Sequence, residues 1–198
     1  MNYDVWGSWS DAVGPNAPFN DSCSPASEQE GSATSAVNAW NTAGFPANRI
    51  ILGVASYGHS FHVNQSSALD ASGNLKLYPP FDKSQQPAGD KWDDTAQGVD
   101  ECGNPNVVGG IFDFWGLIDG GFLKCDGTVA GGIEYIFDNC SKTVRAPKRC
   151  PGHDRLVQLT APSTQPYVYN STSQVMVSFD DATSFGAQLL QFWQEGSY

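Results

Sequence analysis

The first nine residues, Met1–Trp9, alternate in the way that the residues of a β-strand do. One face of such a strand carries Met1, Tyr3, Val5 and Gly7, and the other carries Asn2, Asp4 and Trp6. An aspartate in the middle of an aromatic strand costs free energy unless a partner binds it. Two interpretations follow: an edge strand with a solvated Asp4, or a strand end that presents Tyr3 and Asp4 to a ligand.

A helix and a second strand come next in the pattern. Apolar residues recur at the spacing of one helical stripe, through Ala33, Ala36, Val37, Trp40 and Ala43. Ser32 or Ser35 can cap this helix, and Gly44 ends it. Arg49–Ala55 then runs apolar without alternation, which is typical of a parallel strand buried on both faces. Strand, helix and strand together predict a βαβ unit.

The second strand leads directly into Ser56–Phe61. In parallel α/β folds, ligand-binding groups lie at the carboxyl ends of the strands, so Tyr57 and His59 are candidate site residues. A lone histidine more often makes a structural hydrogen bond than it catalyses a reaction, so both interpretations of His59 stay open.

The alternation of strands and helices stops between His62 and about Asn170. This region is rich in Gly, Asp and Pro, and its best strand candidate is Ile133–Asp138. The pattern predicts a small α+β insertion with Cys102 and Cys140 at its two ends, and we expect these two cysteines to form a disulfide.

Two further segments complete the pattern. Val144–Gln165 holds four of the ten Lys and Arg residues and shows neither helical nor strand periodicity, which alone indicates a flexible basic loop. Val175–Phe179 predicts a parallel strand that ends in two aspartates, and Ser184 can cap a last helix with Trp193 on its apolar side.

Composition excludes several classes of partner. The formal net charge is -11, and no basic cluster is long enough to follow a phosphate backbone, which argues against nucleic acid and anionic membranes. The sequence has no apolar run of membrane-spanning length. Abundant Gly, Trp, Tyr and Phe suit sugar binding, although ordinary core packing accounts for most of these aromatic residues.

Two features predict an extracellular, secreted protein. Asn-x-Ser/Thr sequons, which accept N-glycans, occur at Asn20, Asn64, Asn139 and Asn170. The five cysteines lack the spacing of metal ligands. The sequence carries no signal-peptide pattern, so we expect that an upstream segment is missing from it.

Several motifs occur in a characteristic order: Met1-Asn2-Tyr3-Asp4, then Gly-x-x-x-Tyr-Gly-x-x-Phe over residues 53–61, then the insertion, then Ser-Phe-Asp-Asp-x-x-Ser-Phe over residues 178–185. Together they resemble glycoside hydrolase family 18, and most closely its secreted fungal-type chitinases. The resemblance implies an α/β fold, a (β/α)8 TIM barrel. Residues 1–62 and 171–198 would supply its last three strands, and residues 63–170 would form the chitinase insertion domain.

The resemblance also implies a reaction. The family hydrolyses β-1,4-linked N-acetylglucosamine polymers with retention, through attack by the substrate's own acetamido oxygen. A Glu at the end of an Asp-x-x-Asp-x-Asp-x-Glu motif protonates the glycosidic oxygen. No stretch of this sequence matches that motif, because the acidic run Asp90–Asp94 lacks its spacing. We therefore expect no catalytic residue and no hydrolysis from this chain alone, and no metal or organic cofactor.

What the resemblance implies for these residues is a grip on chitin or chitooligosaccharides, by a monomer if the chain is complete. The residues concerned are Met1, Tyr3, Asp4, Tyr57, His59 and Trp193. Tyr3 would donate its hydroxyl to the acetamido carbonyl, and Asp4 would bind a hydroxyl of the same sugar. The family often has Arg where His59 stands, so the charge partner of Asp4 becomes pH-dependent or is lost.

Departures from the family pattern leave three interpretations. The atypical Val144–Gln165 is hypothesised to be a translated intron, and Met1 an internal methionine. The chain is then a piece of a secreted chitinase, a non-catalytic, lectin-like chitin-binding protein, or a fragment without function of its own.

Overall fold

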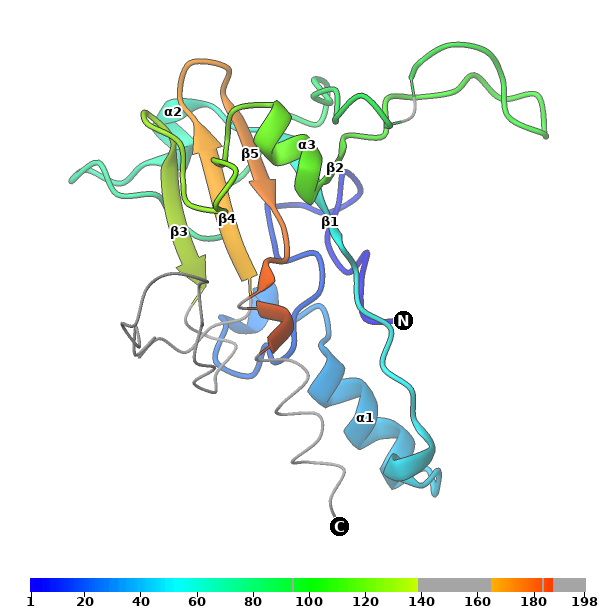
Figure 1. Ribbon diagram of the computed structural model, residues 1–198. Coiled ribbons are helices and arrows are strands. Elements are labelled where there is room, and N and C mark those ends of the chain that lie inside the picture. The colour runs from blue at the N-terminus through cyan, green and yellow to red at the C-terminus, as the bar shows by residue number, and fades with distance from the viewer. Residues whose placement is uncertain (94, 139–164, 183, 187–198) are drawn as a thin grey trace.

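The computed structural model describes residues 1–93, 95–138, 165–182 and 184–186, and its centre is one five-stranded antiparallel sheet. The strand order is β2-β1-β5-β4-β3. The strands are β1 (Tyr57–His62), β2 (Ile111–Asp113), β3 (Glu134–Asp138), β4 (Gln165–Asn170) and β5 (Val175–Ser178). The helices are α1 (Ala33–Thr42), α2 (Gln65–Ala68) and α3 (Phe114–Asp119), with short 3-10 turns η1 (Ala26–Glu28) and η2 (Ala47–Arg49). Figure 1 shows α1 standing apart from the sheet.

Each face of the sheet has its own apolar cluster. Successive side chains of a strand point to opposite faces, so Tyr57, His59 and Phe61 share one face of β1 and Gly58 and Ser60 share the other. The first face carries a buried cluster of Val13, Phe61, Val63, Ala68, Leu75, Tyr167, Tyr169 and Met176. The second face carries Phe112, Leu117, Phe122, Leu123, Val168, Val177 and Phe179, of which Leu117 belongs to α3. The N-terminal loop at Val13 and the segment of residues 63–75, which contains α2, therefore cover one face, and α3 covers the other.

The parallel strands expected from the pattern are not formed among the described residues. Met1–Trp9 and Arg49–Ala55 contain no strand, and Ile51 is 92% exposed. A backbone hydrogen bond of 3.0 Å from the Asn2 N–H to the Gly53 carbonyl joins the two segments. β5 does form, but it pairs antiparallel with β1 and with β4. The apolar run of Arg49–Ala55 was thus misleading, because no neighbouring strand lies beside it within the described residues.

Several other elements are confirmed. Ser32 caps α1 through a capping box with Ser35, in which each side chain accepts the other's backbone N–H. Gly44 follows the helix with a φ of 90°, which glycine adopts without strain. β3 coincides with the predicted strand. Near the C-terminus the helical residues begin after Asp181, whose carboxylate accepts the Ser184 N–H, so the cap is Asp181 rather than Ser184.

The sheet combines strands from both sides of the expected domain boundaries. β1 precedes residue 63 and β5 follows residue 170, yet both lie in the same sheet as β3 and β4. Gln165, expected at the end of an irregular loop, is instead the first residue of β4. Its buried side chain donates to the Ala17 carbonyl at 3.4 Å. The rest of Val144–Gln165 lies outside the described residues.

The cysteines differ from expectation. Cys102 is exposed and carries a free thiol, so the expected disulfide with Cys140, which lies outside the described residues, is not made. Its loop is held by Asp100, whose carboxylate accepts the N–H groups of Cys102 and Asn104 at 2.8 Å. Cys125 is also free and exposed, whereas Cys23 is disulfide-bonded.

Gly58 lies close to the backbone of a neighbouring strand, which makes its packing testable by substitution. A Cβ at this position would overlap the carbonyl oxygen of Ser178 on β5. Gly58→Ala should lower the free energy of unfolding by about 1–3 kcal/mol, measured by chemical denaturation. The matched control is Gly131→Ala, because a Cβ there meets no atom within 4 Å and should change stability by less than about 0.5 kcal/mol. Equal effects of the two substitutions would contradict the packing described.

Candidate functional site

The carboxylate of Asp4 is the centre of the candidate site. Its Oδ1 accepts the Tyr57 hydroxyl at 2.7 Å and lies 2.9 Å from Nε2 of His59. Both partners stand on the same face of β1 because they are two residues apart. One carboxylate oxygen thus joins the N-terminal loop to the first strand of the sheet.

Asn16 fixes the backbone on both sides of this contact. Its side-chain carbonyl accepts the Asp4 N–H at 2.9 Å, and its side-chain amide donates to the Tyr57 carbonyl at 2.9 Å. Its backbone carbonyl also accepts the Val5 N–H at 3.1 Å. Asn16 is fully buried, so loss of these bonds would leave polar groups without water or partner. These hydrogen bonds of Asn16 also hold Asp4 in the left-handed region, with a φ of 58°, which a non-glycine residue adopts rarely.

Aromatic rings surround the carboxylate. The Tyr3 ring lies 6.2 Å from that of Tyr57, and the Trp9 ring lies 5.5 Å from that of His59, both edge to face. Trp9 folds back over Gly7, where a Cβ would meet the indole. Trp9 is 58% exposed, which leaves much of its ring open to solvent.

The two oxygens of Asp4 have different surroundings. The side chain of His59 is 9% exposed and that of Asp4 is 44% exposed, so the carboxylate bridges the interior and the solvent. Within the described residues Oδ2 makes no hydrogen bond. Burial, together with the hydrogen bond to Asp4 and its negative charge, raises the pKa of Tyr57 above its ordinary value, so this phenol is a neutral donor.

Most of the predicted site residues converge. Tyr3, Asp4, Tyr57 and His59 meet although more than fifty residues separate the two pairs in sequence. Met1 is 90% exposed, and its backbone lies beside Gly53. Trp193 lies outside the described residues.

Sequence reasoning missed two members of the site. Trp9 belongs to the opening segment, and the density of aromatic residues in that segment was the signal that could have identified it. Asn16 sits in a polar, proline-rich loop, where no pattern distinguishes a buried clamp from an exposed turn residue.

Neither a metal site nor a membrane span is found in the described part of the chain. No group of three His, Cys, Asp or Glu side chains there is arranged to hold a metal ion. No helix there is both long and apolar enough to cross a bilayer.

Comparison with known proteins shows the family of this chain. The model of glycosyl hydrolases family 18 matches residues 1–196. This chain belongs to glycosyl hydrolase family 18. A chitinase-like effector of Moniliophthora roreri is 50% identical over 186 residues, which cover 93% of this chain and 40% of that protein. The chain thus spans well under half the length of this relative.

Solved structures of chitinases are also similar to this chain. A chitinase from Rhizomucor miehei matches with a TM-score of 0.73 and 27% identity, over 99% of this chain and 45% of that one. A family 18 chitinase from Cycas revoluta, in complex with (GlcNAc)4, matches with a TM-score of 0.57 over 99% of this chain and 38% of that one. At 18% identity the second match supports the fold alone. The chain is therefore structurally similar to part of the TIM-barrel chitinases of the family.

Ionisation of Tyr57 tests the geometry of this family 18 site. The folded-state pKa lies above the ordinary value of 10.0, so this phenol stabilises the fold below pH 10, and that stabilisation is lost as the pH rises further. Asp4→Asn removes the charge but leaves the burial, so Tyr57 should ionise at lower pH than in the wild type. Phenolate absorbance during alkaline titration measures this shift, and Tyr57→Phe identifies the signal. An unchanged titration in Asp4→Asn would contradict the contact.

Proposed function

We propose that this chain binds N-acetylglucosamine oligosaccharides within a chitinase-like glycoside hydrolase. The observation that carries the proposal is the carboxylate of Asp4: Oδ1 is held by Tyr57 and His59, while Oδ2 makes no hydrogen bond within the described residues. The Tyr3 ring lies against that of Tyr57. A carboxylate fixed by two donors loses little conformational entropy when a ligand binds its other oxygen. This is a preorganised acceptor for a sugar hydroxyl.

The surrounding side chains supply the rest of a sugar-binding surface. The Tyr3 hydroxyl donates to the acetamido carbonyl and orients that group, while the exposed face of Trp9 packs on the apolar face of a pyranose ring. Membership of family 18 motivates this choice of ligand, because a chitinase of that family from Cycas revoluta forms a complex with (GlcNAc)4. Hydrolysis requires the Asp-x-x-Asp-x-Asp-x-Glu motif, which this sequence does not contain. Catalysis is therefore proposed only for a longer chain that carries the motif.

The proposed architecture follows from the same family membership. Residues 1–62 and 171–198 belong to a TIM barrel, and residues 63–170 belong to the chitinase insertion domain. The sheet of that domain also contains β1 and β5, which come from the flanking residues. Met1 and Ile51 are exposed, and an apolar surface of this kind suits contact with further barrel strands. The relatives are long enough to contain those strands.

A second candidate function is non-catalytic chitin binding, as in a lectin. The observation that favours it is the description of the relatives from Moniliophthora roreri and Moniliophthora perniciosa as chitinase-like effectors. Both candidates need the same grip on the sugar. They differ in whether a protein that carries this chain also carries the catalytic motif and cleaves chitooligosaccharides.

The binding experiment uses isothermal titration of the purified chain with chitohexaose. Asp4→Asn and Tyr3→Phe should each weaken binding about tenfold, because each removes one hydrogen bond to the sugar, worth about 1.4 kcal/mol. The matched control is Glu101→Gln, an exposed acid in a distant loop, which should bind like the wild type. If all three variants bind alike, the Asp4 surface is not the sugar site.

Secretion is proposed from the disulfide at Cys23 and the sequons, because disulfides persist in oxidising compartments. Asn64 is exposed, and its side chain makes no capping hydrogen bond to α2, so a glycan can attach there without loss of structure. In a secreting eukaryotic host, Asn64→Gln should remove the mass of one N-glycan, as seen by intact mass spectrometry. Asn38→Gln, an exposed asparagine outside any sequon, should not. A glycan-free secreted wild type would contradict the prediction.

A further inference from the structure

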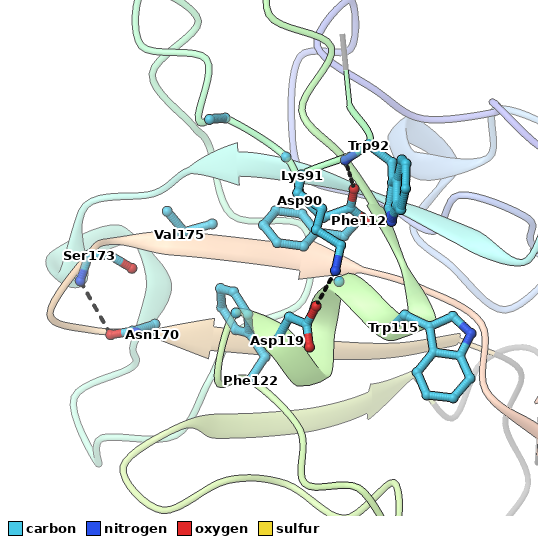
Figure 2. Close-up of a pocket in the computed structure, with 14 residues that line it drawn as sticks. Asp90, Lys91, Trp92, Phe112, Trp115, Asp119, Phe122, Asn170, Ser173 and Val175 are labelled. Carbon is cyan, nitrogen blue, oxygen red and sulfur yellow. Dashed lines mark hydrogen bonds and ion pairs between the residues drawn. The ribbon is translucent and has the colours of Figure 1, made fainter. Parts of the chain in front are cut away.

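A cleft on the opposite face of the sheet contains two more exposed tryptophans. Its volume is about 440 Å³, and it lies between the loop of residues 88–92, α3 and the turn from β4 to β5. Figure 2 shows Trp92 and Trp115 at one end of this cleft and Asn170 and Ser173 at the other. We call it the α3 cleft.

Strand register separates the α3 cleft from the Asp4 site. Gly58 pairs with Phe112, which lines the cleft, whereas Tyr57 and His59 point to the other face of β1. Val175, a second lining residue, pairs with His62 and so shares the face of Phe112. The sheet itself therefore stands between the two places.

The backbone that carries the two indoles is fixed rather than loose. Asp90 accepts the Trp92 N–H at 2.8 Å with one oxygen and the Asp113 N–H at 2.7 Å with the other. These two bonds connect the loop of residues 88–92 to Asp113, which lies directly before α3 and two residues before Trp115. Gly116 is required because a Cβ there would overlap the Asp90 carboxylate. Trp92 is 77% exposed and Trp115 is 74% exposed, so both rings face solvent.

The rest of the lining is amphipathic. Phe112 and Phe122 form an apolar floor, with ring centroids 5.6 Å apart. Above it Lys91 and Asp119 form an ion pair of 3.1 Å in which both side chains are more than half exposed. Exposed indoles over an apolar floor, with a few charged and amide groups nearby, suit a ligand that has apolar faces and a polar edge.

We propose that the α3 cleft is a second sugar-binding site, which stacks a pyranose ring of an N-acetylglucosamine oligosaccharide on Trp92 and Trp115. Asp119 and Lys91 bind its hydroxyls, and Phe112 and Phe122 contact its acetyl methyl group. The identity of the sugar rests on the proposed function, but the site does not use Asp4.

Indole N–H resonances of the ¹⁵N-labelled chain, titrated with chitotriose, test the proposal. The chain is produced without glycans, because Asn170 lines the cleft and lies in a sequon. The resonances of Trp92 and Trp115, assigned with the Trp92→Phe and Trp115→Phe variants, should shift and saturate. Trp40, an exposed indole on α1, is the internal control and should not shift. Trp115→Ala should weaken the affinity reported by Trp92 about fivefold or more.

Each outcome decides a different claim. If the indoles of Trp92 and Trp115 shift while Trp9 does not, the second site stands and the Asp4 site is wrong. If Trp9 alone shifts, or no indole shifts, the second site is overturned. Equal shifts with maltotriose, which lacks acetamido groups, would overturn its preference for N-acetylated sugar.

Discussion

The carboxylate of Asp4 is the contact through which the N-terminal loop and the antiparallel sheet together form the candidate site. The N-terminal loop has no strand of its own, and the antiparallel sheet begins only at Tyr57. Asp4 Oδ1 joins them through Tyr57 and His59, and buried Asn16 fixes the backbone around that joint. Because a positive φ at Asp4 is unfavourable by itself, the surrounding hydrogen bonds determine where its free oxygen points.

Much of the local structure follows from the sequence, and the tertiary pairing does not. The span and cap of α1 depend on neighbouring residues, and they were predicted. The strand β3 was also predicted from its local pattern, although it forms by pairing with β4. The strands expected at Met1–Trp9 and Arg49–Ala55 depend on partners beside them, and the described residues contain none. Tyr3, Asp4, Tyr57 and His59, which the motifs singled out, lie together in the structure, and their role in sugar binding stays a prediction. Asn16 was missed because its burial is a property of the fold and not of its loop's composition.

The two proposed sugar-binding sites lie on opposite faces of the sheet. Period-two alternation along β1 sends Tyr57 and His59 to one face. Gly58, where a Cβ would meet the Ser178 carbonyl, lets β5 lie close beside β1 in the sheet. Each face then carries its own aromatic groups near solvent: Tyr3 and Trp9 beside Asp4, and Trp92 and Trp115 over α3. In a family whose members include chitinases, both arrangements offer the same chemistry, an apolar ring next to fixed polar groups.

A crystal structure of this chain soaked with chitotriose tests the central claim most directly. The account predicts a sugar with its acetamido carbonyl on the Tyr3 hydroxyl and a ring hydroxyl on Asp4 Oδ2, while Tyr57 and His59 keep their contacts with Oδ1. Sugar density in the α3 cleft alone, or a ligand that displaces Tyr57 or His59 from Asp4, would contradict it.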